Sequence, residues 1–227
     1  MIASIRDKAT VFRDREEAGR QLAAALVEES LSGAIVVLAL PRGGVPVAYP
    51  VAAALNAPLE VLLVRKIGVP YHQELAVGAI ASGGVSVLNQ TLMDRLGLSE
   101  ADLEPIYRRE QAELERRDHD YSGGEPFPPI AGKTAILVDD GIATGATMEA
   151  AVEAVRMHGP ASVIVAVPSA ARDSVARIET KADRVIALSI PEPYIAVGAW
   201  FVDFPQVTDA EVVRLLGEAS RRYREGA

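Results

Sequence analysis

Apolar runs of strand length, separated by helix-like segments, constrain the fold of this chain most strongly. Residues 34–40 read AIVVLAL, a continuous apolar run that is typical of a strand buried on both faces. Further runs predict strands at 59–65, 134–140, 162–168 and 183–189, and a hairpin at 77–80 and 85–88. Segments whose apolar residues recur at helical spacing lie between most of these runs. This alternation predicts an α/β fold with a mostly parallel sheet and helices on both faces.

One segment carries most of the functional information. Residues 136–148 read ILVDDGIATGATM, an apolar strand that ends in two aspartates and continues through small residues into a helix. Asp139 and Asp140 are acceptor-only groups, which suit the two hydroxyl donors of a cis-diol. The small residues let backbone N–H groups approach an anion, and the helix start adds a positive dipole end. A diol beside a phosphate describes a ribose 5-phosphate.

Other readings of this segment fit less well. It lacks the Gly-Lys-Ser/Thr of a Walker loop, and its glycines do not form G-x-G-x-x-G. An ordinary turn with a helix cap would explain Thr144 or Thr147. It would not explain two adjacent aspartates, which are disfavoured in strands. The segment therefore favours a sugar-phosphate site.

The segment resembles the signature of the type I phosphoribosyltransferases, which bind 5-phosphoribosyl-1-pyrophosphate (PRPP). The resemblance implies a PRTase-like α/β fold, a parallel-sheet core with helices on both faces, and transfer of ribose 5-phosphate to a small nitrogenous base. It implies that Asp139 and Asp140 hold the ribose hydroxyls and contact Mg2+ mainly through PRPP and water. The 5-phosphate would lie on Gly141, Ile142, Ala143, Thr144, Gly145, Ala146 and Thr147.

The same resemblance assigns a pyrophosphate loop after the first core strand. Arg42, Gly43 and Gly44 occupy that place, and Arg65 and Lys66 end the second strand. Among these, Arg42 and Lys66 join the aspartates as candidate catalytic residues. Taken alone, residues 41–44 fit a tight turn equally well. Residues 71–74 stand where the family has a mobile loop, and Glu74 is either a base or a partner of Lys66.

A small C-terminal hood would hold the nucleobase, again by resemblance. Residues 191–204 read PEPYIAVGAWFVDF, in which Tyr194, Ile195 and Trp200 are alternative stacking residues. Trp200 fits a core or dimer-interface position equally well. Ala143 stands where enzymes for 6-oxopurines carry a third carboxylate, which weakens that substrate class. A proton acceptor would then be Glu74, a hood residue or the base itself.

We expect a single domain over residues 1–227. Its predicted parts are a core at about 14–190, a helical insert at about 90–130, the hood at about 191–207 and a C-terminal helix at about 208–224. The insert contains a strongly charged helix at 99–117, whose glutamates and arginines alternate at the spacing of a solvated helix. This helix either covers the site or builds a dimer contact.

Composition excludes several classes of protein. The chain has 31 acidic and 23 basic residues, for a net charge of −8, which argues against nucleic-acid or anionic-membrane binding. It has no cysteine, which excludes a disulfide framework, a thiolate zinc site and a cysteine nucleophile. Its first residues scatter charges rather than forming a signal, so we expect a cytoplasmic protein. The family resemblance also implies that the protein forms a homodimer.

The sequence therefore predicts a Mg-dependent phosphoribosyltransferase of the nucleobase-salvage type. A second hypothesis is a PRPP or nucleotide sensor on the same fold, which would bind without turnover. A third is a sugar-phosphate hydrolase, which would need a base or nucleophile that the sequence does not reveal.

Overall fold

The computed structural model describes residues 10–70 and 72–226, and for residues 72–74 it describes the backbone. Five parallel strands of this part form the central sheet, in the order β2-β1-β6-β7-β8. The strands are β1 (Ile35–Ala39), β2 (Leu59–Val61), β6 (Thr134–Val138), β7 (Ser162–Ser169) and β8 (Arg184–Ser189). The predicted parallel α/β core is confirmed.

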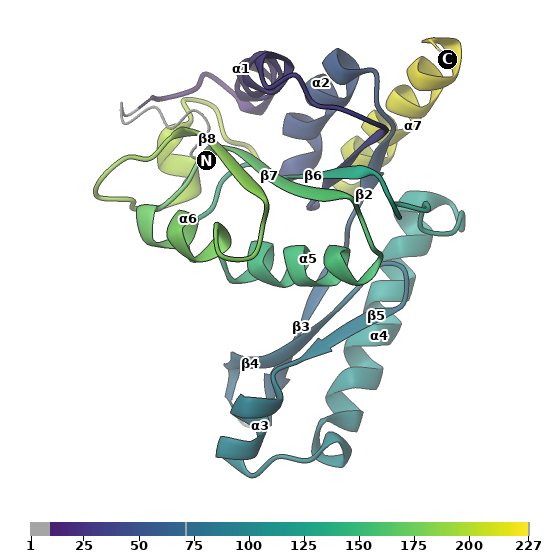
Figure 1. The fold of residues 1–227 in the computed structure, drawn as a ribbon, viewed down its shortest axis with the longest axis vertical. Coiled ribbons are helices and arrows are strands. Elements are labelled where there is room, and N and C mark those ends of the chain that lie inside the picture. The colour runs from purple at the N-terminus through teal and green to yellow at the C-terminus, as the bar shows by residue number, and fades with distance from the viewer. Residues whose placement is uncertain (1–9, 71, 227) are drawn as a thin grey trace.

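Helices cover both faces of this sheet, as Figure 1 shows. One face carries α1 (Arg15–Glu28), α2 (Gly44–Leu55) and α7 (Asp209–Gly226), and the other carries α5 (Ala146–Met157) and α6 (Arg172–Ile178). Alternate strand residues supply the two cores, so Val37 and Ala39 pack with α1 and α2 while Val36 and Leu38 pack with α5. Both faces are apolar because both are covered.

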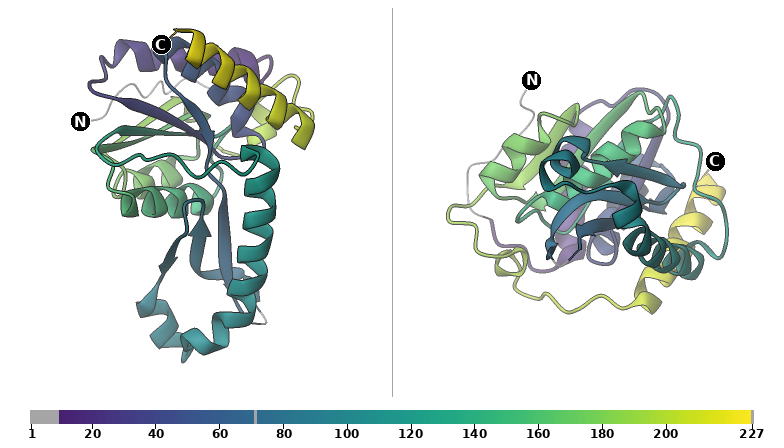
Figure 2. Two further views of the ribbon diagram at one scale, coloured as in Figure 1. Left: turned by 90° about the vertical axis from the view of Figure 1, so that its right-hand side faces the viewer. Right: turned by 90° about the horizontal axis from the view of Figure 1, so that it is seen from below.

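A second, antiparallel sheet forms an arm below the core in Figure 1. It contains β3 (Val64–Val69), β4 (His72–Ala81) and β5 (Val85–Leu88), followed by α3 (Gln90–Leu96). Helix α4 (Glu100–Ser122) then runs back along the arm to the core, as Figure 2 shows from the side. Glycine at 123, with φ +65°, ends α4.

The single strand predicted at 59–65 is wrong, because this stretch contributes to both sheets. β2 ends at Val61 in the core, and β3 begins at Val64 in the arm. The N–H of Leu62 donates to the Ala39 carbonyl at 2.9 Å, and the N–H of Leu63 donates to the Ser82 hydroxyl at 3.0 Å. The apolar run is continuous because both leucines are buried at this junction.

After β8 the chain forms the region predicted as the hood, which contains the short helix η1 (Val197–Trp200). Phe12 pairs with it, since its N–H donates to the Trp200 carbonyl at 2.9 Å and its carbonyl accepts from Val202 at 2.8 Å. Helix α7 follows and packs on α2. Among the helices of the described residues, none combines the length and apolar character that a membrane span requires.

Candidate functional site

The carboxyl ends of β1 and β6 meet in the middle of the central sheet and define the candidate site. The two strands pair in parallel, from Ile35 with Thr134 to Ala39 with Val138. The chain leaves β1 towards β2 on one side and leaves β6 towards β7 on the other. Such a reversal of strand order opens a crevice at the carboxyl edge, where open α/β sheets bind ligands.

Two glycines of the loop after β1 lie against the paired aspartates. A Cβ added to Gly43 would lie 2.0 Å from Oδ2 of Asp140, and one added to Gly44 would lie 3.3 Å from Oδ1 of Asp139. The neighbouring Pro41–Arg42 peptide bond is cis. Only residues without a side chain allow so close an approach. The structure thus brings together two groups that the sequence analysis predicted separately.

Burial dominates the electrostatics of the two aspartates. Burial, and after it the charge of Asp140, raises the pKa of Asp139 well above the ordinary value. Burial also raises the pKa of Asp140, although the Arg15 guanidinium opposes this effect. The N–H of Asp140 donates to Oδ1 of Asp139 at 2.8 Å. Adjacent carboxylates with little water around them are costly unless donors or a cation meet them, so the pair is suited to a ligand that supplies either.

Arg15 is a site residue that the sequence analysis missed. Its Nε and one terminal nitrogen each lie 2.9 Å from Oδ2 of Asp140, and the other terminal nitrogen donates to the Pro205 carbonyl at 2.7 Å. The guanidinium also stacks 3.6 Å above the centre of the Phe204 ring. The sequence feature that could have identified it is a charged residue on the buried face of α1, three residues before Ala18.

The turn between β6 and α5 contains the predicted phosphate-binding residues. Gly141 and Ile142 are buried at its base, whereas Ala143, Thr144, Ala146 and Thr147 are exposed. Gly145 precedes α5 with φ +77°, a conformation that favours glycine. The exposed residues therefore surround the N-terminus of a 12-residue helix, where free N–H groups and the helix dipole favour an anion.

Two side chains of helix α6 form hydrogen bonds with the backbone of this turn. The hydroxyl of Ser174 donates to the Ala143 carbonyl at 2.6 Å, and a terminal nitrogen of Arg177 donates to the Thr144 carbonyl. Arg177 also pairs with Glu149 of α5 at 2.9 Å. The turn is thus tied to α6 through its carbonyl groups.

Tyr194, in the region predicted as the hood, lies against the start of the same turn. Its hydroxyl forms a hydrogen bond with the Ser169 hydroxyl at 3.1 Å and would lie 3.0 Å from a Cβ added to Gly141. Burial, with smaller effects from both aspartates, raises the pKa of Tyr194 to about 12. The Trp200 ring packs against the Tyr194 ring at 6.0 Å between ring centres, while Ile195 is 77% exposed. Of the three alternatives, Tyr194 borders the aspartates.

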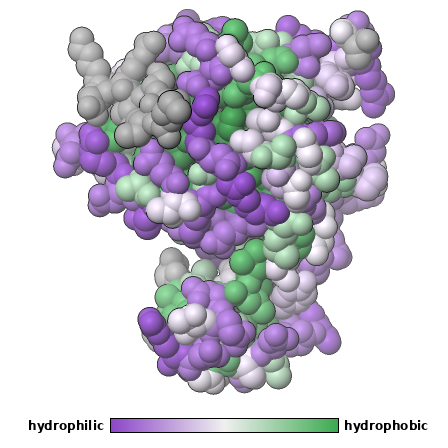
Figure 3. All heavy atoms as spheres, in the orientation of Figure 1, coloured by the Kyte–Doolittle hydropathy of each residue, from purple (hydrophilic) through white to green (hydrophobic). Residues whose placement is uncertain are grey.

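The predicted pyrophosphate cations occupy three different surroundings. Arg65 and Lys66 point to opposite faces of β3, as successive strand residues do. Arg65 pairs with Glu110 of α4 at 2.6 Å, while the exposed Lys66 lines a groove between the arm and α5. Arg42 lies 3.6 Å from Asp209 at the start of α7. Figure 3 shows apolar surface on the arm below the core. Tyr71 and the side chains of residues 72–74, including Glu74, lie outside the described part.

Within the described residues no group of three or more histidine, aspartate or glutamate side chains could enclose a metal ion. Asp139 and Asp140 nevertheless offer adjacent carboxylate oxygens in poorly solvated surroundings. Magnesium is commonly held by one or two carboxylates together with substrate phosphates and water. The residues therefore fit a magnesium ion that arrives with a phosphorylated substrate.

Known proteins resemble this chain in sequence and in fold. A family model described as "Phosphoribosyl transferase domain" matches residues 12–199. Two relatives from Mycobacterium tuberculosis, strains CDC 1551 and H37Rv, are each named "Putative phosphoribosyl transferase" and are 48% identical over 216 residues. That match covers 95% of this chain and 48% of each relative, so the chain spans about half their length.

Solved structures also resemble the chain. The crystal structure of TT1426 from Thermus thermophilus is 43% identical, covers 92% of this chain and 99% of that one, and has a TM-score of 0.84. The AQ2163 protein from Aquifex aeolicus is 16% identical, covers 81% and 78% respectively, and has a TM-score of 0.50. The second likeness concerns the fold alone.

Proposed function

The chain belongs to the family of phosphoribosyl transferase domains, and from this premise we propose that it transfers ribose 5-phosphate from PRPP to a nitrogenous base and releases pyrophosphate. The observation that carries the proposal is the contact of the Gly43–Gly44 loop with Asp139 and Asp140 at the reversal of strand order. The two carboxylates, the turn before α5 and a glycine loop lie together at the carboxyl edge of the sheet, which supports the proposal. A ribose with a phosphate at each end requires such a combination.

In the proposed reaction the bond between C1 of the ribose and a pyrophosphate oxygen breaks, and its electron pair leaves with pyrophosphate. A lone pair of the base nitrogen forms the new bond to C1 from the opposite face, which inverts that carbon, and the proton of that nitrogen passes to solvent. Asp139 and Asp140 accept hydrogen bonds from the two ribose hydroxyls and stabilise the positive charge that develops on the ring. The buried pair acts strongly because little water screens it.

The remaining assignments rest on the family resemblance. The turn of residues 141–147 receives the 5-phosphate on its N–H groups and the start of α5. Arg42, Gly43 and Gly44 receive the pyrophosphate, with either Arg65 or Lys66 as a further cation, because these two point to opposite faces of β3. When magnesium is bound with the substrate at Asp139 and Asp140, it neutralises charge on the leaving group.

The hood supplies the base site. Tyr194 is the better stacking residue because it borders Gly141 and the aspartates, whereas Trp200 packs against the Tyr194 ring. The exposed Ala143 offers no carboxylate to a base nitrogen. We therefore favour a base that needs no such partner over a 6-oxopurine. A homodimer belongs to the same proposal and rests on the family resemblance.

A pyrophosphate-release assay with PRPP, magnesium and a panel of purine, pyrimidine and other nitrogenous bases tests the proposal. We expect release that depends on one class of base. Asp139→Asn/Asp140→Asn serves as the inactive control. Binding of PRPP without turnover on any base would support the sensor hypothesis instead. Ribose phosphate formed without added base would indicate a hydrolase.

A further inference from the structure

The insert helix α4 presents one side to the core. Its buried residues Glu110, Leu114 and Tyr121 recur at helical spacing, and the half-buried Arg117 lies between the last two on the same side. Tyr121 is only 8% exposed. This side of α4 packs on β3 of the arm and on α7 of the core.

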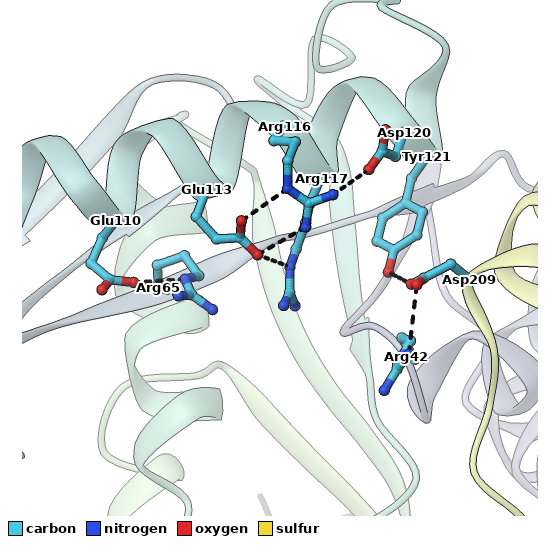
Figure 4. A network of polar contacts seen from close by, with 9 residues as sticks. All are labelled: Arg42, Arg65, Glu110, Glu113, Arg116, Arg117, Asp120, Tyr121 and Asp209. Carbon is cyan, nitrogen blue, oxygen red and sulfur yellow. Dashed lines mark hydrogen bonds and ion pairs between the residues drawn. The ribbon is translucent and has the colours of Figure 1, made fainter.

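Three arginine–carboxylate pairs follow one another along this side of α4, as Figure 4 shows. Arg65 of β3 pairs with Glu110 of α4 at 2.6 Å, and Arg117 pairs with Glu113 of the same helix at 2.7 Å. The third pair joins Arg42 of the glycine loop to Asp209 of α7 at 3.6 Å. The arginines on this side of α4 therefore come from β3, from α4 itself and from the glycine loop.

Tyr121 connects α4 to the third pair. Its hydroxyl donates to Oδ1 of Asp209, while Oδ2 of the same carboxylate faces Arg42. Burial and the neighbouring Asp209 raise the pKa of Tyr121 to about 12, so the hydroxyl remains a donor at any physiological pH. One carboxylate therefore links the insert helix to the glycine loop.

The two adjacent arginines of α4 differ in direction. Arg117 uses its Nε to bond Glu113, and Figure 4 shows its terminal nitrogens on the same side of α4 as Arg42. Arg116 bonds the same Glu113 but turns towards Asp120, and its side chain is 59% exposed against 40% for Arg117. A guanidinium that is bonded along one edge still has its other nitrogens for a second anion.

We propose that α4 forms a second wall of the pyrophosphate site, in which Arg117 binds the pyrophosphate group and Tyr121 positions Arg42 through Asp209. This inference rests on the proposed function. Two guanidinium groups, one from α4 and one from the glycine loop, suit a group that carries several charges and many acceptor oxygens. The role assigned to the insert is then part of substrate binding rather than a cover or a dimer contact.

Calorimetric titration of inorganic pyrophosphate, PRPP and ribose 5-phosphate, each with magnesium, tests the inference. We expect Arg117→Gln to weaken binding of pyrophosphate and PRPP about tenfold and to leave ribose 5-phosphate unchanged, because only the first two carry the group that Arg117 contacts. Arg116→Gln is the matched control, since it removes an equal charge and a bond to the same Glu113. We expect it to change none of the three affinities.

Tyr121→Phe tests the positioning role separately. The ring keeps its packing, so the fold should persist, while pyrophosphate affinity should fall about threefold and ribose 5-phosphate affinity should not change. Equal effects of Arg117→Gln and Arg116→Gln, or equal losses for all three ligands, would overturn the inference and leave the proposed function intact. If the wild type binds neither PRPP nor ribose 5-phosphate, the proposed function itself fails and the inference falls with it.

Discussion

Arg15, the first residue of helix α1, contacts Asp140 at the end of β6 through two nitrogens at 2.9 Å each. The pair is nearly buried, with side-chain exposures of 10% and 14%. Breaking a buried pair by removing one partner leaves an uncompensated charge, which is strongly destabilising. Arg15 therefore determines how readily Asp140 stays ionised, and the helix that begins with it becomes part of the site.

Arg15→Gln should move the acid limit of PRPP binding to higher pH. Arg15 holds the pKa of Asp140 down against burial, so its loss raises that pKa further. In the proposed site the Asp140 carboxylate must be ionised to accept hydrogen bonds from the ribose hydroxyls. The variant therefore loses this acceptor at a higher pH than the wild type does. PRPP affinity measured from pH 5 to 8 should show this shift and a loss of about tenfold at neutral pH. Arg13→Gln, which removes an exposed neighbour paired with Asp14, should match the wild type. Identical pH profiles for all three proteins would contradict the prediction.

Asp139→Asn should stabilise the protein at neutral pH while weakening PRPP binding. The pKa of Asp139 is raised in the folded state above the ordinary 3.8, so its contribution to stability is fully present below 3.8 and is lost as pH rises through the raised value. The neutral amide avoids that loss. In a domain of this size, each kcal/mol gained raises Tm by about 2–4 °C.

Thermal unfolding at pH 7 and at pH 4 checks the predicted direction of this change in stability. The advantage of Asp139→Asn should shrink at pH 4, where the wild-type carboxyl is itself largely protonated. Asp140→Asn is the paired comparison, because it leaves Arg15 without its partner and should not stabilise. A lower Tm for Asp139→Asn at pH 7 would show that the aspartate is a structural requirement of the fold.

Gly43→Ala should weaken PRPP binding at least tenfold without unfolding the protein. The new methyl would lie 2.0 Å from Oδ2 of Asp140, so either the carboxylate or the loop must move. Gly217→Ala in α7 is the control, because its nearest neighbour would be Nη1 of Arg221 at 4.0 Å. That change should stabilise the helix by about 0.5–1 kcal/mol and leave PRPP affinity unaltered. Calorimetry and thermal unfolding measure both effects, and equal PRPP affinities for the two variants would be inconsistent with a tight glycine loop.

Tyr194→Ala should raise KM for the base, with little effect on KM for PRPP. Stacking of a base on an aromatic ring contributes about 1–3 kcal/mol, or roughly 5- to 150-fold. Tyr194→Phe keeps the ring and loses only the bond to Ser169, so its KM for the base should stay within about threefold of the wild type. If the phenylalanine variant loses as much as the alanine variant, the hydroxyl rather than the ring contacts the base.

Much of the core was predictable because local patterns dictate it. The run at 134–140 shows a buried strand and its terminal aspartates without any tertiary information. The strand break at Leu62 was not predictable, because both sheets bury the same kind of residue there and the apolar run continues through it. The arm strand β3 was likewise hidden within that run.

The candidate site was predictable where its residues are neighbours in sequence. Arg15 and Asp140 are 125 residues apart, and no local pattern joins them. The shared carboxylate of Asp209 depends on how α7 packs beside α4, which periodicity does not encode. Arg65 and Lys66 looked alike as adjacent cations, and strand alternation sends them to different faces.

Calorimetric titration of PRPP with magnesium into the wild type and into Asp139→Asn/Asp140→Asn tests the central claim most directly. We predict magnesium-dependent binding to the wild type and a loss of at least tenfold in the double variant, with ribose 5-phosphate weakened in parallel because it carries the same diol. A wild type that does not bind PRPP at millimolar concentration, or a double variant that binds it equally well, would contradict the proposal that the two aspartates form a PRPP site.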